Sequence, residues 1–235
     1  MAFDIIFSVG SDKQVGYNSR IMAKYPIYLD LTNAPAVVVG AGSVAARKVK
    51  TLIEAGAAVK VVTKTVEKDF DEICKGLTIE IVISDYERSH LKEAFLVIAA
   101  TDDPELNTRI YNDCQSLKIL CNVVDVPHLC NFYVPSVIRQ GDLQIAISTN
   151  GKCPAYAAHL RRTFEKLITE DHARFLEGLD DIRREIIANG VPLADRKTML
   201  VKLSNDDSFE MFLKEGPQAW KQKSLKMFSA KRNKG

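Results

Sequence analysis

The sequence predicts a doubly wound α/β fold, in which helices cover both faces of a parallel sheet. It is followed by a small β-hairpin and helix unit and then by a helical C-terminal module. Apolar stretches alternate with helix-like segments from Ala36 to Asp125. These stretches are continuously apolar rather than alternating, which is typical of strands buried on both faces. The strands are expected at Ala36–Val39, Ala58–Val62, Ile79–Ile83, Phe95–Ala100 and Ile119–Val124.

The pattern changes after the fifth of these stretches. Two strand-like segments, Phe132–Arg139 and Leu143–Thr149, flank a Gln-Gly-Asp sequence that is typical of a hairpin turn. Beyond them only helix-like segments follow, at Pro154–Ile168, His172–Ala188, Leu193–Leu203 and Ser208–Met227. We therefore expect an N-terminal extension over 1–24, the parallel-sheet domain over 25–130, the hairpin and helix unit over 131–170 and the helical module over 171–235.

Composition excludes several classes of protein. The net charge of +2 and the pI of about 8.2 are too mild to indicate a nucleic-acid partner. No apolar run approaches the roughly 18 residues of a membrane span, so no membrane partner is expected. The five cysteines include no Cys-x-x-Cys pair, which argues against a disulfide framework or a structural metal site and favours the cytoplasm.

The segment Val39-Gly40-Ala41-Gly42-Ser43-Val44-Ala45 joins the first strand to a helix with a Gly-x-Gly-x-x-Ala turn. In dinucleotide-binding domains the first glycine permits the tight turn and the second lets the backbone approach a pyrophosphate. A small third residue, here Ala45, lets the helix pack closely on the strand. The alternative is a purely structural turn. The pattern favours a nucleotide, with Gly40 and Gly42 at its pyrophosphate.

The loop after the second strand leaves the type of dinucleotide open. The carboxylate that usually holds the ribose 2′-hydroxyl about 20 residues past the glycines is replaced by Thr63-Lys64-Thr65. The hydroxyls suit a ribose, whereas Lys64 would tolerate a 2′-phosphate, so NAD is favoured only modestly over NADP. The loop at Thr101-Asp102-Asp103 should contact the same cofactor, although Asp-Asp-Pro is also a common helix start.

Asp125 ends the fifth strand, where a carboxylate would face the cleft beyond the sheet. A reaction that releases a proton needs a base at this place. The alternative is that Asp125 only caps a loop or pairs with an arginine. His128 follows three residues later, but one histidine and one aspartate do not make a metal site. Basic residues near the hairpin would either bind an acidic ligand or form a solvated face; they are Arg139, Lys152, Arg161 and Arg162.

Several stretches together resemble the precorrin-2 dehydrogenase family, which is the dehydrogenase and ferrochelatase portion of siroheme synthase. The resemblance runs from about Tyr25 to Arg162 with the order and spacing of the stretches kept. They are Val38–Lys48, Ala99–Asp103, Cys121–Asp125 and Ile147–Pro154. The C-terminal helices match only in general character, and the methyltransferase half of larger siroheme synthases has no counterpart.

The resemblance implies NAD-dependent oxidation of precorrin-2 to sirohydrochlorin. In bifunctional members it also implies insertion of ferrous iron into that product, an inference weakened because dehydrogenase-only members exist. It further implies a homodimer built through the hairpin and helix unit. By matching position, Asp125 would be the catalytic residue, and Ser43, Val44, Lys64 and Thr65 would contact NAD together with the glycines and Thr101. Substrate carboxylates would meet His128, Arg139, Ser148, Thr149, Asn150, Lys152 and Arg161.

Two other classes of protein share parts of the pattern. A regulatory NAD-binding module without catalysis would have the same glycine turn, but such modules usually keep an acidic residue after the second strand. A short-chain dehydrogenase would need a Tyr-x-x-x-Lys pair to activate its tyrosine, and no tyrosine in the sequence has a lysine four residues later. The regulatory module remains the alternative to the enzyme.

Overall fold

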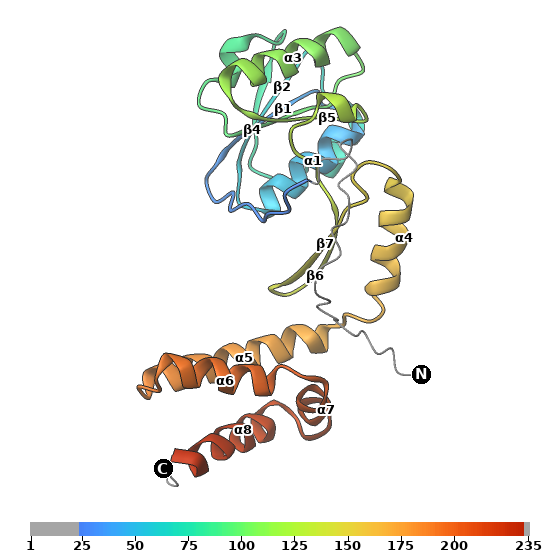
Figure 1. Ribbon diagram of the computed structural model, residues 1–235. Coiled ribbons are helices and arrows are strands. Elements are labelled where there is room, and N and C mark those ends of the chain that lie inside the picture. The colour runs from blue at the N-terminus through green and yellow to red at the C-terminus, as the bar shows by residue number, and fades with distance from the viewer. Residues whose placement is uncertain (1–23, 233–235) are drawn as a thin grey trace, which may run out of the picture.

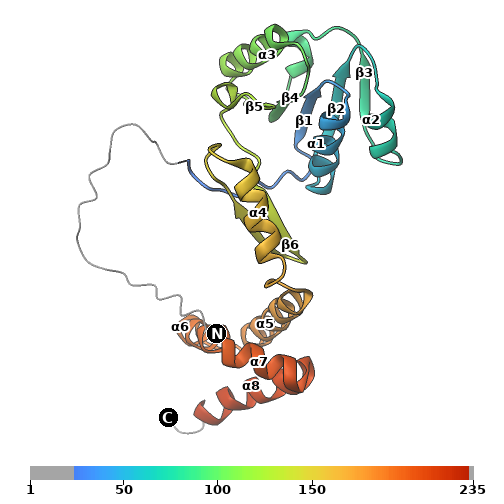
Figure 2. The same ribbon diagram turned by 90° about the vertical axis from the view of Figure 1, so that its right-hand side faces the viewer.

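The structure is a computed structural model that describes residues 24–232, with side chains described as far as Met227. The expected extension over 1–24 lies outside the described residues except for Lys24. Figures 1 and 2 show three groups of elements. A parallel-sheet domain and a bundle of helices lie at opposite ends, and a hairpin with one helix lies between them.

A parallel five-stranded sheet forms the first domain, as predicted. Its spatial order is β3-β2-β1-β4-β5. The first strand is therefore flanked by the second and the fourth, and the strand order reverses beside it. Loops that leave the carboxyl ends of these neighbouring strands meet at one edge of the sheet. The strands are β1 (Pro35–Val39), β2 (Ala58–Thr63), β3 (Glu80–Ile83), β4 (Leu96–Ala99) and β5 (Leu120–Val123).

Helices cover both faces of this sheet (Figure 1). Side chains of β1 alternate between two buried clusters: Val38 joins the cluster under α1 and α2, while Val37 and Val39 join the one under α3. Each buried valine contributes about 1.5–3 kcal/mol relative to an exposed one, so both faces hold the helices in place. The helices are α1 (Ser43–Glu54), α2 (Lys68–Ile73), the 3₁₀ turn η1 (Arg88–Leu91) and α3 (Pro104–Leu117).

The hairpin consists of β6 (Ser136–Gln140) and β7 (Leu143–Ile147), which pair antiparallel, and α4 (Pro154–Phe164) follows it. The prediction that the first hairpin strand begins at Phe132 was wrong. The Phe132 carbonyl instead accepts a hydrogen bond from Asn122 Nδ2 at 3.0 Å, and Pro135 has no N–H to donate. The second strand ends before Ser148, whose hydroxyl accepts a bond from the Asn150 N–H at 3.1 Å. The predicted helix from Pro154 likewise ends at Phe164 rather than Ile168.

The C-terminal module contains α5 (Glu170–Ala188), α6 (Leu193–Leu203), α7 (Asp206–Glu215) and α8 (Pro217–Arg232). The prediction of one helix over Ser208–Met227 was wrong, because Gly216 adopts a φ of +86° and Pro217 starts a new helix. The resulting corner lets Trp220 return to the core beside Phe212 with a ring-centroid separation of 5.4 Å. The Trp220 indole N–H donates to Ser208 Oγ at 2.9 Å.

The cysteines are all free thiols: Cys74, Cys114 and Cys121 are buried, Cys130 is half-buried and Cys153 is exposed. Within residues 24–232, no cluster of three or more histidine, cysteine, aspartate or glutamate side chains is placed to hold a metal ion. Over the same residues, no helix has the length and apolar character needed to cross a membrane.

Candidate functional site

A cleft of about 730 Å³ lies at the carboxyl edge of the parallel sheet. The loops after β1, β2, β4 and β5 line it, as expected for the point where strand order reverses in an open sheet. It brings together the predicted catalytic residue and every predicted cofactor-contacting residue. These are Gly40, Gly42, Ser43, Val44, Lys64, Thr65, Thr101 and Asp125.

The glycine turn leaves space that any side chain would fill. Gly40 has a φ of +106°, and a Cβ placed on it would lie 2.4 Å from the carbonyl oxygen of Ala100. Gly42 precedes α1 and offers no side-chain cap to the first N–H groups of that helix, whose first turn holds no acidic residue. A helix N-terminus with uncapped donors attracts an anion, so the turn fits a pyrophosphate.

The loop after β2 folds back over this turn. The Glu67 N–H donates to the Ala41 carbonyl at 3.1 Å, and the Glu67 carboxylate oxygens lie 3.2 Å from the position that a Cβ on Gly42 would take. Lys64 Nζ is 2.6 Å from an Asp85 carboxylate oxygen, and this contact raises the pKa of Lys64. Sequence reasoning missed Glu67, because nothing local indicates that the loop turns back toward the glycines.

The loop after β4 is held by a buried amide. The Thr101 hydroxyl donates to Asn107 Oδ1 at 2.8 Å, and Asn107 Nδ2 donates to the Thr101 carbonyl at 2.9 Å. Asp103 caps α3 by accepting bonds from the N–H groups of Glu105 and Leu106. The Thr101 side chain is therefore fixed before any ligand arrives. Asn107 was not predicted, although it follows Thr101 by six residues in the first turn of the next helix.

Asp125 occupies a turn directly after β5. The Val124 N–H still bonds to the Ala99 carbonyl at 2.9 Å, as the sheet would require, and the next residue, Asp125, then adopts a left-handed φ of +60°. Asparagine and aspartate tolerate this conformation better than other residues that carry a side chain. The turn leaves the Asp125 side chain exposed at the cleft. A carboxylate so placed is available to a bound substrate.

Lys48 is a basic residue whose pKa is affected by the Asp125 carboxylate. It lies on α1 one turn after Val44, which lines the same cleft, and its side chain is half-buried. Burial lowers the pKa of Lys48 and the neighbouring Arg47 lowers it further, whereas Asp125 acts to raise it. Asp125 is thus an acidic group that affects the Lys48 charge. Sequence reasoning did not single out Lys48.

The segment after the Asp125 turn runs along the outer edge of β5. The Cys121 N–H donates to Asn131 Oδ1 at 2.7 Å and Asn131 Nδ2 donates to the Ile119 carbonyl at 3.2 Å. Phe132 packs against the α1-side cluster. Backbone groups of an edge strand need such partners, and here the cover also fixes both ends of the turn that carries Asp125.

The predicted substrate loop does not line this cleft. Cys153 precedes α4 and its N–H donates to Thr149 Oγ1 at 3.2 Å, while Asn150 has a φ of +57°. Asn150 Oδ1 is buried and has no hydrogen-bond partner among the described residues. Tyr133 connects this loop to the Asp125 turn: its hydroxyl donates to the Pro127 carbonyl at 2.9 Å, and its ring lies 3.8 Å from a Cβ placed on Gly151.

The remaining predicted substrate residues are dispersed. His128 is exposed in the 3₁₀ turn η2 (Pro127–Leu129). Arg139 lies 3.8 Å from a Glu54 carboxylate oxygen. Arg161 pairs with Glu165, four residues later in the sequence. Arg162 and Lys152 are exposed. The cleft therefore gathers the predicted cofactor residues and Asp125, but not the basic residues predicted to bind the substrate.

Two families match consecutive parts of the chain. An NAD(P)-binding family matches residues 27–136, and the family described as "Sirohaem biosynthesis protein central" matches residues 140–167. The siroheme synthase of Psychrobacter sp. (strain PRwf-1) is 32% identical over 176 residues, which are 75% of this chain and 36% of that protein. Siroheme synthase 1 of Aeromonas salmonicida is 32% identical over 194 residues, 83% of this chain and 42% of the relative. Over most of its length the chain is therefore similar to part of these siroheme synthases.

The siroheme synthase of Methylobacillus flagellatus is 37% identical over 165 residues, 70% of this chain and 35% of that protein. The chain thus spans about two fifths or less of the curated siroheme synthases that it matches. A solved structure titled "SirC, precorrin-2 dehydrogenase" superposes with a TM-score of 0.70 at 24% identity. The match covers 86% of this chain and 100% of that one, which confirms the predicted fold.

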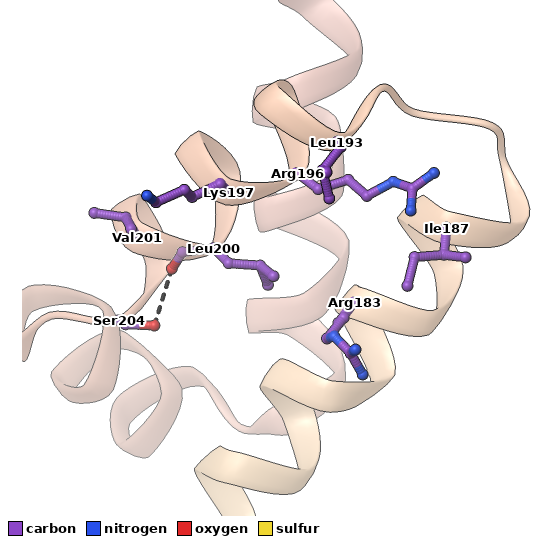
Figure 3. Close-up of a pocket in the computed structure, with 8 residues that line it drawn as sticks. All are labelled: Arg183, Ile187, Leu193, Arg196, Lys197, Leu200, Val201 and Ser204. Carbon is purple, nitrogen blue, oxygen red and sulfur yellow. Dashed lines mark hydrogen bonds between the residues drawn. The ribbon is translucent and has the colours of Figure 1, made fainter.

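A second hollow, of about 620 Å³, lies between α5 and α6 in the helical module (Figure 3). Aliphatic side chains and the stems of basic residues line it, and Ser204 Oγ donates to the Leu200 carbonyl at 2.9 Å. None of the site residues predicted from the sequence lines it. The cleft of the parallel sheet is therefore the candidate functional site.

Proposed function

We propose that the protein oxidises precorrin-2 to sirohydrochlorin with NAD as the hydride acceptor. One observation carries the proposal: an exposed carboxylate, Asp125, shares a cleft with a glycine turn whose open space fits a pyrophosphate. The relatives named siroheme synthase and the structural likeness to a precorrin-2 dehydrogenase support the same chemistry. A carboxylate held in a sparsely populated backbone conformation is also typical of functional sites.

Different residues of the chain have different roles in the proposed reaction. NAD supplies the chemistry of hydride acceptance when it is bound. Gly40 and Gly42 admit its pyrophosphate, and the first N–H groups of α1, from Ser43 and Val44, donate to it. Thr65, Lys64 and Thr101 line its remaining length. As the hydride leaves precorrin-2, the Asp125 carboxylate accepts the proton released from the same substrate, so that sirohydrochlorin, NADH and one proton result.

The substrate side of the proposal rests on the loop before α4. Precorrin-2 carries many carboxylates, which suit hydroxyl, amide and basic side chains. Tyr133 joins this loop to the Asp125 turn, so a tetrapyrrole at Asp125 would reach its polar groups. We assign substrate contacts to Ser148, Thr149, Asn150 and Lys152, and at the periphery to His128, Arg139 and Arg161.

Insertion of ferrous iron into sirohydrochlorin is proposed as a second activity of the same site. Chelation replaces ring N–H protons by the metal, so it also needs a base beside the macrocycle. Asp125 is exposed and already placed there in the dehydrogenase proposal. In this reaction the iron is a substrate. Formation of siroheme from sirohydrochlorin and Fe²⁺ under anaerobic conditions tests it, and a rate equal to that without protein would refute it.

A homodimer in the cytoplasm completes the proposal. Around the hairpin unit, Tyr156 and Leu167 are 55% and 62% exposed, and Tyr28 is 66% exposed beside β7. Exposed apolar groups gathered in one region are typical of an interface, and the free thiols fit a reducing compartment.

Light scattering after gel filtration should give twice the monomer mass. Leu167→Glu should lower it, whereas Leu193→Glu, at an exposed site on α6, should not; a monomeric wild type contradicts the dimer.

The experiment that tests the enzyme directly is an anaerobic assay with enzymatically generated precorrin-2 and NAD. NADH and sirohydrochlorin absorbance should grow together. Binding of NAD without any turnover, while a known dehydrogenase consumes the same precorrin-2, would contradict the enzyme and favour the regulatory NAD-binding module.

A further inference from the structure

We propose that Glu67 selects NAD over NADP by accepting hydrogen bonds from the hydroxyls of the adenosine ribose. The inference rests on the nucleotide site of the proposed function and adds a residue that sets its specificity. In the related sheet domains a carboxylate about 20 residues past the glycines binds the ribose 2′-hydroxyl. The sequence has no carboxylate at the end of β2. Lys64 at that position would tolerate the 2′-phosphate of NADP, so the sequence alone did not exclude NADP.

The structure supplies a carboxylate from farther along the chain. Both carboxylate oxygens of Glu67 lie 3.2 Å from the position of a Cβ on Gly42. The backbone of Glu67 is fixed on both sides, because its N–H donates to the Ala41 carbonyl at 3.1 Å and its carbonyl accepts from the Phe70 N–H at 3.0 Å. Its side chain is exposed and lines the cleft. Glu67 therefore offers a hydrogen-bond acceptor at the glycine turn, on a fixed backbone and accessible to a ligand.

The cleft offers little counter-charge to a 2′-phosphate. Lys64 is the one basic residue among the described residues that line it, and Lys64 Nζ already contacts Asp85 at 2.6 Å. The carboxylates that line the cleft are Glu67, Asp102, Asp103 and Asp125. A phosphate carries roughly 1.5–2 negative charges near pH 7, and like charges placed together oppose binding. Glu67 would thus accept a hydroxyl and repel a phosphate.

The geometry assigns Lys64 a different part from the one its residue type suggests. With Asp85 beside it, part of the Lys64 charge in the cleft is balanced within the protein. Removing the Asp85 charge should release Lys64 and improve binding of NADP alone. Glu67 and Asp85 therefore disfavour the 2′-phosphate in separate ways. Glu67 repels the phosphate, and Asp85 pairs with Lys64, the cation that would otherwise bind it.

The test is a calorimetric titration of the full chain with NAD and with NADP, in wild type, Glu67→Gln and Glu67→Asp. Wild type should bind NAD at least about tenfold more tightly than NADP, a difference that one unfavourable charge contact can supply. Glu67→Gln keeps the shape and should reduce that ratio by about tenfold, chiefly through tighter binding of NADP. Glu67→Asp keeps the charge and should retain the preference.

Glu72→Gln is the matched control, because Glu72 is exposed on α2 and pairs with Lys68 at 3.7 Å, away from the glycines. It should leave the ratio unchanged, and Asp85→Asn should lower the ratio with Glu67 intact. An unchanged ratio in Glu67→Gln, or an equal change in Glu72→Gln, overturns the specificity proposal while the dehydrogenase stands. Failure of the wild type to bind either dinucleotide overturns the proposed function as well.

Discussion

Gly40 and Ala100 touch backbone to backbone at the point where the strand order of the sheet reverses. A Cβ on Gly40 would lie 2.4 Å from the Ala100 carbonyl oxygen. The neighbouring backbone cannot retreat, because the Ala100 N–H bonds to the Val39 carbonyl and the Gly40 N–H bonds to the Val62 carbonyl, both at 2.9 Å. If the turn binds a pyrophosphate, as proposed, then fold and cofactor binding depend on the same glycine.

Gly40→Ala should therefore abolish NAD binding and lower the free energy of unfolding by about 2–5 kcal/mol, from backbone strain and overpacking together. Gly76→Ala is the matched control. Gly76 also has a positive φ, +80°, but a Cβ there meets nothing within 4 Å, so it carries the strain without the clash. Chemical denaturation and NAD titration of both variants check this. Equal losses in the two variants would mean that the contact with Ala100 is unimportant.

Asn107→Leu should lower the free energy of unfolding by about 1–3 kcal/mol, because it leaves buried polar groups of the Thr101 loop without partners. It should also weaken NAD binding, since that loop lines the cleft. Thr108→Ala, the next residue on α3, removes only an exposed bond from Thr108 Oγ1 to the Pro104 carbonyl and should change stability by less than about 0.5 kcal/mol. Unaltered NAD affinity in Asn107→Leu would show that the loop is not fixed by Asn107.

Lys48 should make stability rise with pH in the alkaline range. Burial lowers the pKa of Lys48 below its usual 10.5 in the folded state, so between the folded value and 10.5 the unfolded chain binds more protons. The free energy of unfolding therefore increases as pH rises through that window. Lys48→Met should flatten the increase, and Lys50→Met, at an exposed site on the same helix, should not. Parallel slopes in all three proteins would contradict the burial of the Lys48 amine.

Lys48→Met should also alter turnover through its effect on Asp125. Because Asp125 acts on the charge of Lys48, removing the cation should lower kcat, while the KM for NAD stays within about twofold. Lys48→Arg should restore much of the rate by restoring the charge. A wild-type kcat in Lys48→Met would limit Lys48 to a structural role.

The sequence was sufficient for much of the sheet, because strands buried on both faces must be continuously apolar and helices must cover them. It also placed Asp125 and the glycine turn at one edge, since the carboxyl ends of parallel strands meet there. It could not place Glu67, because the backbone bond from Glu67 to Ala41 that brings it to Gly42 is a tertiary contact. Nor could it indicate that Asp125 acts on the pKa of Lys48, because the two residues lie far apart in the sequence.

Two of the errors in the predicted elements have clear local causes. Phe132 belongs to an apolar run that looks like a strand, but the side chain of Asn122 takes its carbonyl. The helix predicted from Ser208 onward has continuous helical patterning, and the positive φ of Gly216 interrupts it. A tertiary hydrogen bond decided the first and a backbone conformation the second, and neither is visible in hydrophobic periodicity.

The most direct test of the account compares wild type with Asp125→Asn and Asp125→Gly in the anaerobic precorrin-2 assay. Asparagine and glycine both accept the φ of +60° at this position, so the turn should survive while the base is lost. Wild type should give equal amounts of NADH and sirohydrochlorin. Both variants should show turnover reduced by about 10²–10⁴-fold with NAD affinity nearly unchanged. Wild-type turnover in Asp125→Asn would contradict the account.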